Sequence, residues 1–492
     1  MRALPRPDSR WLALAGLLAL AAALRIPGLR YGLPFPLLNP DEESIVPRAW
    51  AMGHDGGLDP GWYDYPSFLF DLLAVFQLPF DAPSYEMART IAAAVGIVGV
   101  AAAWWLGRAA YGDAAGLVAG AACAVATVHV AYSHMAVTDV LLASGVTLAL
   151  ALLVTERLEW AGLAVGLAAS AKYPGALLLV PLLLSGWRQW RRLTVATVLA
   201  AAAFALTSPF VLLNAGAAWD DIARVQRLAR AGWLGFEDDH PTPIAFLDRL
   251  WESLGPFLLL ALAGLALALG NLVFQEHKLS RRVRDIGLAR RAGNLVFQEH
   301  KPRARRADLV LASFALVYFV QLLALEAHFD RYVLPLVPVL GALAGRIRPL
   351  VPAALVLLLV PLAWSASQVR ELTRTDTRVV AHAWIEDNLP LDAVVAVESS
   401  APPVDPRTTI RLELPGPGRE TDPKRDVEEL RGRGVGYVLV TGAVADRVLA
   451  STKHYPHESR FYVQLEEETQ RLLRVGPGGE LVGPWVALYR IG

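Results

Sequence analysis

The stretch Asn39-Pro40-Asp41-Glu42-Glu43 has the residue types and the spacing for proton-transfer chemistry. Its three carboxylates come soon after the first apolar run of the chain. Like charges beside a membrane helix repel one another and gain nothing from lipid. Such a cluster is typical of a site that takes a proton, holds a cation or binds an acceptor. We expect Asp41 or Glu42 to act as general base while an acceptor hydroxyl attacks a sugar carbon. The alternative is a solvated loop or a cap for a helix that starts at Ser44.

A second carboxylate, Asp139, lies in a very short predicted outer loop that begins at Tyr132. It should approach Asp41 if the first and fourth helices are neighbours, and it would then support the first carboxylate. The alternative is that Thr138 or Asp139 caps the N-terminus of the next helix.

Two cations, Lys172 and Arg331, stand at the predicted outer ends of apolar runs. A lipid-phosphate leaving group at that depth would need such partners, with Arg as a bidentate fork and Lys as a point charge. The alternative for both is snorkelling to the membrane interface. For Arg331, a local contact with Asp330 is a further alternative.

Other polar side chains are expected to wall the same pocket: Asp64, Tyr65, His134, Tyr173 and His328. No cofactor is evident. The sequence is compatible with a divalent cation held by Asp41, Glu42, Asp139 and either His54 or His134, but no spacing is diagnostic of a metal site.

Long apolar runs must position these residues. The chain of 492 residues is 54% hydrophobic, and runs of about the length needed to cross a bilayer recur along its first three quarters. We expect about eleven crossings. The candidate spans are 11–29, 90–106, 114–132, 140–154, 161–171, 175–184, 193–213, 254–274, 309–325, 332–344 and 351–364.

Charge alternates across the loops between these runs. With a cytoplasmic N-terminus, basic residues fall in the inner loops and acidic residues in the outer ones, including the first outer loop, 30–88. The segment 67–80 is too short to cross and is predicted to be re-entrant or interfacial. Arg25 would snorkel to the outer interface, and the run 11–29 also resembles a signal peptide.

The character changes near residue 370. We predict a membrane domain over residues 1–369 and a small extracytoplasmic α/β domain over residues 370–492. In the second domain we expect strands at 394–397, 437–440, 461–464 and 485–489, and helices at 379–388 and 427–433. The string Gly-Asn-Leu-Val-Phe-Gln-Glu-His-Lys occurs at Gly270 and at Gly293 and is interpreted as a local duplication in a basic inner loop.

Composition excludes some classes of function. The net charge is zero and no basic domain with interleaved aromatic residues is present, so we expect no nucleic-acid partner. The single cysteine, Cys123, lies in an apolar run, which rules out a disulfide framework within one chain.

Over roughly residues 10–370 the chain resembles the GT-C class of integral-membrane glycosyltransferases. It is closest to bacterial relatives of dolichyl-phosphate-mannose protein mannosyltransferases and of the lipid A aminoarabinose transferase. The resemblance rests on Asn39-Pro40-Asp41-Glu42, Tyr63-Asp64-Tyr65-Pro66-Ser67, Ser133-His134, Thr138-Asp139, Ser170-Ala171-Lys172-Tyr173-Pro174 and His328-Phe329-Asp330-Arg331-Tyr332 followed by Leu334-Pro335.

This resemblance implies a polyprenyl-phosphate sugar donor and inverting transfer to a protein, lipid or glycan acceptor of the cell envelope. It places the acidic role on Asp41 and Glu42, a supporting role on Asp139, and phosphate binding on Lys172 and Arg331. The expected fold is a polytopic α-helical membrane protein of the plasma (inner) membrane with a C-terminal α/β domain outside. The alternatives are a polytopic transporter and a non-catalytic envelope-assembly protein.

Overall fold

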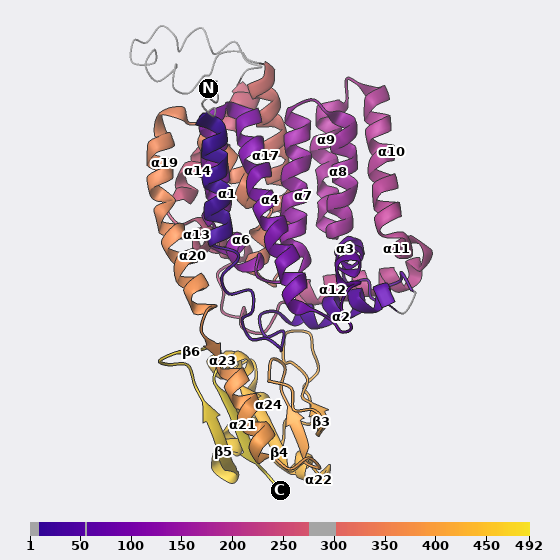
Figure 1. The fold of residues 1–492 in the computed structure, drawn as a ribbon, viewed down its shortest axis with the longest axis vertical. Coiled ribbons are helices and arrows are strands. Elements are labelled where there is room, and N and C mark those ends of the chain that lie inside the picture. The colour runs from indigo at the N-terminus through magenta and orange to yellow at the C-terminus, as the bar shows by residue number, and fades with distance from the viewer. Residues whose placement is uncertain (1–8, 55–56, 275–301) are drawn as a thin grey trace, which may run out of the picture.

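Apolar helices make up the first three quarters of the chain in the computed structural model, which describes residues 9–54, 57–274 and 302–492. They stand side by side in a bundle, with a smaller mixed domain at one end (Figure 1). The basic loop and most of the duplicated string fall in residues 275–301 and lie outside the described residues. The bundle contains α1 (Ser9–Ala23), α4 (Tyr85–Tyr111), α5 (Asp113–Val125), α6 (Thr127–Tyr132), α7 (Thr138–Val154), α8 (Leu158–Ala171), η1 (Tyr173–Leu178), α9 (Leu179–Gly186), α10 (Trp190–Thr207), α14 (Phe257–Phe274), α17 (Pro302–Leu322), η2 (Asp330–Val333), α18 (Leu336–Gly345), η3 (Arg348–Leu350), α19 (Val351–Leu357) and α20 (Leu359–Glu371).

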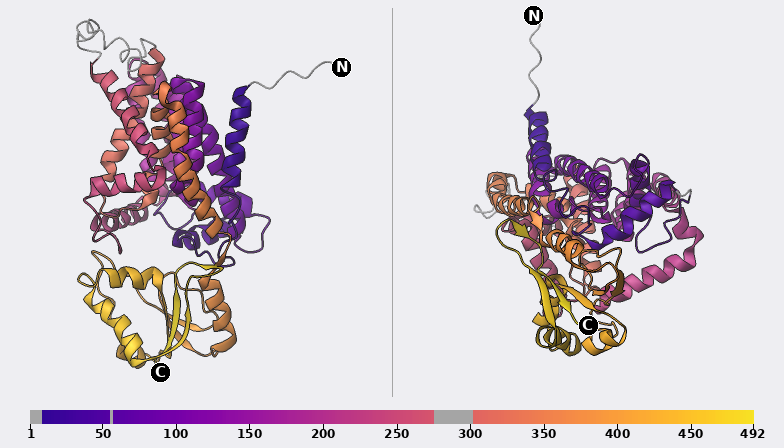
Figure 2. Two further views of the ribbon diagram at one scale, coloured as in Figure 1. Left: turned by 90° about the vertical axis from the view of Figure 1, so that its left-hand side faces the viewer. Right: turned by 60° about the horizontal axis from the view of Figure 1, so that its bottom comes forward.

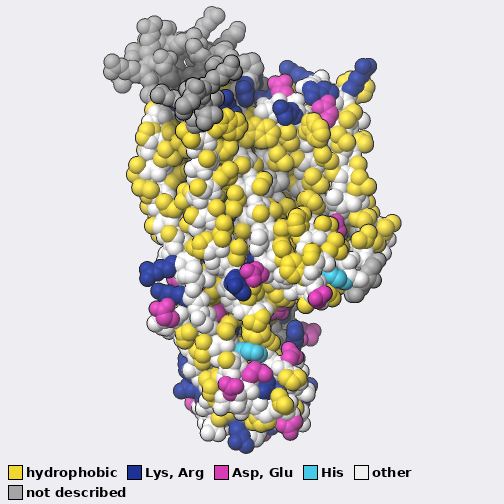
Figure 3. Space-filling view, in the orientation of Figure 1, with side chains coloured by type: hydrophobic (Ala, Val, Ile, Leu, Met, Phe, Trp, Pro, Cys, Tyr) yellow, Lys and Arg dark blue, Asp and Glu magenta, His cyan; other side chains and the backbone are white. Residues whose placement is uncertain are grey.

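Each predicted apolar run coincides with one helix or with a broken pair of helices. Among the described residues, the helix 85–111 and the continuous helical stretch 348–371 (η3, α19 and α20) are each long and apolar enough to cross a membrane. The number is three if the bent pair α13 and α14 counts as a single span. Apolar side chains cover the visible flank of the bundle, and charged side chains gather at its two ends (Figure 3). The protein is therefore a membrane protein, while these lengths do not establish the predicted number of crossings.

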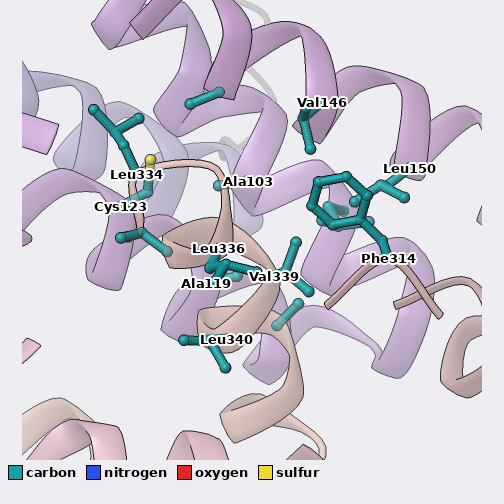
Figure 4. Close-up of a cluster of buried hydrophobic side chains, with 14 of the residues drawn as sticks. Ala103, Ala119, Cys123, Val146, Leu150, Phe314, Leu334, Leu336, Val339 and Leu340 are labelled. Carbon is teal, nitrogen blue, oxygen red and sulfur yellow. The ribbon is translucent and has the colours of Figure 1, made fainter. Parts of the chain in front are cut away.

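Small residues allow close packing inside the bundle. A Cβ atom added to Gly162 of α8 would lie 2.1 Å from the Ala196 carbonyl oxygen of α10, and one added to Gly166 would lie 2.2 Å from that of Ala200. Such glycines let two helix backbones approach each other. Figure 4 shows part of the apolar core, in which Cys123 is buried.

Arg25 does not snorkel, contrary to the prediction. Its side chain is buried inside the bundle, where it donates to the carbonyl oxygens of Cys123 at 3.0 Å and Ala124 at 2.9 Å and to the hydroxyl of Ser133 at 3.1 Å. The break between α5 and α6 at Ala126 leaves these carbonyls without helical partners, so the guanidinium satisfies them.

Short helices cover the end of the bundle that faces the smaller domain (Figure 1). The predicted short segment 67–80 forms a ten-residue helix that packs against α2. A bend of 119° separates α13 from α14. These helices are α2 (Pro40–His54), α3 (Phe68–Gln77), α11 (Pro209–Leu213), α12 (Ala215–Ala231) and α13 (Thr242–Leu254).

The chain after α20 forms a five-stranded sheet in the order β3-β2-β4-β7-β5 with helices packed on it. Strands β3, β2 and β4 are parallel, whereas β7 runs antiparallel to both β4 and β5. A separate pair, β1 and β6, lies next to the bundle (Figure 1). The elements are β1 (Thr375–Asp376), α21 (Thr377–Asn388), β2 (Val394–Val397), β3 (Thr408–Arg411), α22 (Val427–Gly432), β4 (Tyr437–Thr441), α23 (Gly442–Ala450), α24 (Pro456–Glu468), β5 (Gln470–Val475), β6 (Leu481–Val482) and β7 (Val486–Arg490).

One predicted strand of this domain is wrong. Residues 461–464 lie inside helix α24, where Phe461, Tyr462 and Leu465 are buried on one face. Pro456 opens that helix at a position where its missing N–H costs nothing. The other predicted strands and helices of the domain are confirmed within a few residues of their boundaries.

The sheet domain rests on the covered end of the bundle, and the two parts share several contacts (Figure 2). Arg378 donates to the carbonyl oxygen of Leu37 at 2.9 Å. Arg419 lies over the ring of Trp233, 4.6 Å from its centroid. The first contact joins the domain to the segment just before the predicted acidic stretch, and the second joins it to the residues that follow α12.

Candidate active site

Asp41 lies in the first turn of α2, with its backbone N–H bonded to the Asn39 side chain at 2.9 Å. A carboxylate is favoured at this end of a helix by the helix dipole. Its Oδ2 accepts from Arg331 at 2.7 Å and from the Tyr65 hydroxyl at 2.8 Å. The side chain is 23% exposed, so Asp41 is paired but still reachable from solvent.

The surroundings of Asp41 keep it charged. Burial alone would raise the pKa of this carboxyl, but the Arg331 guanidinium, the Tyr65 hydroxyl and the Lys172 ammonium outweigh burial and bring the pKa below its ordinary value. Asp41 is therefore a carboxylate at neutral pH and can accept a proton.

Lys172 and Asp139 form a second ion pair of 2.6 Å, in which the Asp139 side chain is buried. The Lys172 ammonium lies 5.2 Å from the ring centroid of Tyr65 and 5.5 Å from that of Tyr332. A cation between aromatic faces is stabilised by the ring quadrupoles. Lys172 therefore lies buried in the same cluster as Asp41, which contradicts simple snorkelling.

Asp330 orients Arg331 without pairing with its guanidinium. The Asp330 carboxylate accepts from the backbone N–H of Arg331 at 2.8 Å and from the Tyr132 hydroxyl at 2.7 Å. The guanidinium points instead to Asp41. The predicted local contact between Asp330 and Arg331 is therefore present, but it involves the Arg331 backbone, and the carboxylate fixes the backbone of η2.

Unused hydrogen-bonding capacity remains at the cluster. In the described part of the chain, the Nε of Arg331, the Oδ2 of Asp139 and the hydroxyl of Thr138 are buried without a hydrogen-bond partner. Buried polar groups are rarely left unpaired in a resting structure without reason. Val137 occupies the N-cap of α7 and no side chain caps the helix, so the predicted capping role of Thr138 or Asp139 is wrong.

Glu42 does not share the surroundings of its neighbour. Its side chain is completely buried, and its two oxygens accept from Arg89 at 2.9 and 2.7 Å. One of them also accepts from the backbone N–H of Ala136 at 2.8 Å. Both Glu42 oxygens are therefore occupied, whereas Asp41 keeps part of its side chain exposed.

Asp64 and Tyr173 lie beside the cluster. Asp64 pairs with Arg224 of α12 at 2.5 Å, and burial raises its pKa despite that cation. The Tyr173 hydroxyl donates to the carbonyl oxygen of Tyr63 at 2.9 Å. Both side chains hold the segment that carries Tyr65, and neither contacts Asp41 through a hydrogen bond.

The two predicted histidines lie elsewhere. His134 is buried, and its ring nitrogens lie 2.9 Å from the carbonyl oxygens of Val130 and Pro27. It lines a cavity of about 330 Å³ between the bundle and the sheet domain. His328 contacts Asp239 at 3.1 Å and Thr242 at 3.3 Å. Neither histidine has a hydrogen bond to Asp41, Asp139, Lys172 or Arg331 in the described residues.

A cation site of the predicted kind is not assembled in the residues that the structure describes, since no three His, Cys, Asp or Glu side chains come together there. Asp41 and Asp139 each pair with a basic side chain instead. Sequence reasoning assigned no role to Tyr332, Tyr132 and Arg89. Tyr332 belongs to the motif that carries Arg331, so a role could have been assigned to it, whereas the roles of Tyr132 and Arg89 depend on tertiary contacts.

Comparisons with known proteins identify the fold. The family model of dolichyl-phosphate-mannose-protein mannosyltransferases matches residues 69–213. No curated protein matches the chain. ArnT from Cupriavidus metallidurans bound to undecaprenyl phosphate gives a TM-score of 0.57 at 15% identity, covering 97% of each chain.

An archaeal enzyme is similar as well. The apo oligosaccharyltransferase of Archaeoglobus fulgidus gives a TM-score of 0.56 at 12% identity, over 92% of this chain and 73% of that one. The same organism's oligosaccharyltransferase AglB, in complex with an inhibitory peptide and a dolichol-phosphate, gives 0.54 at 12% identity, over 91% and 70%.

At these identities the likeness establishes the fold. The chain has the fold of the GT-C class of integral-membrane glycosyltransferases, which confirms the predicted resemblance. The particular proteins that it resembles over almost its whole length include ArnT of C. metallidurans.

Proposed function

We propose that this protein transfers a hexose or pentose from a polyprenyl-phosphate donor to an acceptor hydroxyl at the outer face of the membrane, with inversion at the anomeric carbon. The observation that carries the proposal is the buried cluster of two carboxylates and two cations, Asp41–Arg331 and Asp139–Lys172. Structures of ArnT with undecaprenyl phosphate and of AglB with a dolichol-phosphate support a lipid-phosphate donor for this fold.

The two cations suit a departing phosphate. Charge accumulates on the phosphate as the bond to the sugar breaks, and preorganised cations in a site of low dielectric stabilise that charge strongly. Arg331 keeps an unpaired buried Nε, and Lys172 donates a hydrogen bond to a single Asp139 oxygen. Both groups can therefore add contacts to phosphate oxygens without dismantling the cluster.

Donor binding would also prepare the base. When Arg331 turns part of its guanidinium to the phosphate, Asp41 loses some of the interaction that lowers its pKa. A less stabilised carboxylate is a stronger base. The donor thus converts a paired Asp41 into a proton acceptor at the moment when an acceptor hydroxyl can react.

The transfer step is balanced as a single displacement. The acceptor oxygen forms a bond to the anomeric carbon from the face opposite the phosphate while the bond from that carbon to the phosphate oxygen breaks. The hydroxyl proton passes to Asp41, and the electron pair leaves with the lipid phosphate beside Lys172 and Arg331. Asp139 holds Lys172 in place and keeps Oδ2 available for a sugar hydroxyl.

The proposal also includes the orientation of the protein in the membrane. Eleven crossings, a cytoplasmic N-terminus and a division into residues 1–369 and 370–492 place the cluster and the sheet domain outside the plasma membrane. The alternation of basic and acidic loops supports this orientation. The site is consistent with a protein, lipid or glycan acceptor.

Substitution of Asp41 tests the proposal directly. Asp41→Asn keeps the size and the hydrogen-bonding capacity of the side chain but cannot accept a proton at neutral pH, so we expect transfer to fall at least a thousandfold, about 4 kcal/mol in barrier. The measurement is mass spectrometry of envelope glycans from cells lacking the gene and complemented with wild type or variant. Full restoration by an inserted Asp41→Asn protein would overturn the assignment.

A further inference from the structure

We propose that the buried Glu42–Arg89 pair is a positioning strut that sets the separation between Asp41 and Asp139. This inference rests on the proposed function for its activity readout. It assigns Glu42 and Arg89 a role in placing two other carboxylates, and no contact with substrate.

The pair is bidentate and completely enclosed. Arg89 Nε donates to one Glu42 oxygen at 2.9 Å and Nη2 donates to the other at 2.7 Å, with both side chains at 0% exposure. A parallel fork of this kind fixes distance and orientation together. Because water does not reach the pair, thermal exchange with solvent partners cannot loosen it.

Arg89 and Glu42 also form hydrogen bonds with other parts of the chain. Arg89 Nη1 donates to the carbonyl oxygens of Leu29 at 3.2 Å and Tyr31 at 2.7 Å. On the other side, Glu42 accepts from the Ala136 N–H at 2.8 Å. One ion pair thus ties together the loop after α1, the helix α2, the helix α4 and the segment that leads into α7.

The positions of these contacts explain why they matter. Glu42 is adjacent to Asp41, and Ala136 lies three residues before Asp139. Asp41 and Asp139 hold Arg331 and Lys172, so the strut indirectly fixes the spacing of the two cations. A displacement of about 1 Å in a catalytic group can cost about a hundredfold in rate.

A double-substitution cycle separates positioning from direct participation. Glu42→Gln leaves the Arg89 charge unpaired, and Arg89→Met leaves the Glu42 charge unpaired. The double variant removes both charges and keeps an amide oxygen for the Ala136 N–H. For proteoliposomes supplied with membrane-extracted lipid-linked sugars, we expect each single variant to lose about tenfold to a hundredfold in rate per folded protein. The double variant should regain at least tenfold over Arg89→Met.

Binding and mobility supply readouts that a general loss of stability would not reproduce. The Kd for undecaprenyl phosphate should rise less than the transfer rate falls in folded single variants, because both phosphate cations remain although their spacing is relaxed. Hydrogen exchange should become faster in peptides covering residues 39–46 and 134–140. The positioning role would be overturned if hydrogen exchange became faster only in other regions, or if the double variant transferred sugar no faster than either single variant.

The matched control is the exposed pair Arg30–Glu86, which joins the same loop to the same helix at 3.4 Å with side chains 80% and 52% exposed. Arg30→Met with Glu86→Gln should change neither the transfer rate nor the hydrogen exchange, because water replaces the lost partner.

The outcomes also separate this inference from the proposed function. If Asp41→Asn still transfers sugar, the proposed function fails, and the positioning role of the Glu42–Arg89 pair is then tested by hydrogen exchange alone. If Glu42→Gln and the double variant are both inactive and Arg89→Met is active, Glu42 itself is the base.

Discussion

Two adjacent carboxylates, Asp41 and Glu42, have different surroundings because successive residues of a helix point about 100° apart. One faces Arg331 and remains partly exposed, whereas the other enters the bundle and meets Arg89. The division leaves one carboxylate available for chemistry. A pair of acids that looks redundant in the sequence is therefore not redundant in the fold.

The Tyr65 hydroxyl is expected to tune the pH dependence of transfer. Its hydrogen bond favours the charged form of Asp41, so Tyr65→Phe should raise the pKa of Asp41. A raised pKa keeps the base protonated to higher pH, and the acid limb of the rate profile should move up by roughly one pH unit. The plateau at neutral pH should change little. The measurement is the transfer rate between pH 3 and 8.

Tyr63→Phe is the matched control for this prediction. The Tyr63 hydroxyl donates to Asp59 on the same outer segment and has no hydrogen bond to Asp41. Its removal should leave the acid limb where it is in wild type. An unshifted limb in Tyr65→Phe would mean that another group is the base.

Sequence motifs identified Asp41, Asp139, Lys172 and Arg331 as a set. Their pairing could not be read from the sequence, because Arg331 and Asp41 are 290 residues apart and several acids compete for each cation. His134 shows the opposite error. It adjoins a site motif in sequence, but in the fold its ring nitrogens meet the backbone carbonyls of Val130 and Pro27.

At the scale of elements, breaks in the apolar helices are stabilised by buried polar groups. Arg25 stabilises the break between α5 and α6 by donating hydrogen bonds to two carbonyl groups there. Unpaired carbonyls in a bundle interior cost about 1–3 kcal/mol each. The break can therefore persist only with such a donor.

Removal of this donor should destabilise the bundle. Arg25→Met leaves the Cys123 and Ala124 carbonyls unpaired, and we expect a loss of about 1–3 kcal/mol in the free energy of unfolding after the relief of a buried charge is allowed for. Thermal unfolding in detergent measures it. Arg108→Met is the control, because its partner Asp113 is 69% exposed and the pair is screened. Equal stability of the two variants would contradict the role of Arg25.

The contact of α8 with α10 should be equally sensitive to a larger side chain. Gly162→Val places atoms where the Ala196 carbonyl oxygen lies, and overpacking of this kind costs about 1–3 kcal/mol. The folded yield after size-exclusion chromatography should fall. Gly16→Val is the comparison, since an added Cβ there meets nothing within 4 Å. An unchanged yield for Gly162→Val would show that the two helices can separate freely.

Most elements could be predicted from periodicity and run length. The exception at 461–464 arises because Phe, Tyr and Val favour strands locally, whereas burial of Phe461, Tyr462 and Leu465 on one face selects a helix. Helix α23 and strands β3 and β5 were missed, although the turn signal Gly476-Pro477-Gly478-Gly479 directly follows β5. Local preference is a weak guide wherever packing decides.

For the whole molecule, the sheet domain docks close to the cation cluster. Arg419 of that domain covers Trp233, whose ring lies 5.6 Å from the ring of Phe329, and Phe329 in turn lies under the Arg331 guanidinium at 4.9 Å. Trp233 therefore stands between the two parts of the protein. This chain of contacts links domain placement to the site.

Trp233→Ala should loosen that link. We expect transfer to fall several-fold and trypsin to cleave faster after Arg374, between α20 and β1, because a cation–aromatic contact of about 1 kcal/mol and its packing are lost. Timed proteolysis and initial rates measure both effects. Lys453→Ala should be neutral, since its pair with Asp238 has side chains 70% and 56% exposed. Identical behaviour of the two variants would contradict a coupling through Trp233.

The general architecture followed from hydropathy and charge alternation, because both arise from the bilayer itself. The docking of the sheet domain did not, since Arg419 and Trp233 carry no motif and meet only through tertiary structure. The sequence therefore predicts the features that the bilayer imposes on the chain, and it does not predict which surfaces of the bundle and the sheet domain come into contact.

The separation of Asp41 and Arg331 along the chain has a consequence for biosynthesis. A ribosome releases Asp41 long before the residue that is its ionic partner, 290 positions later. Until then the Asp41 carboxylate of the nascent protein lacks the guanidinium with which it pairs in the folded chain. If the proposed function is right, a half-made chain in the translocon cannot yet engage a lipid phosphate with both cations, and the site is completed only when the late helices insert beside the early ones.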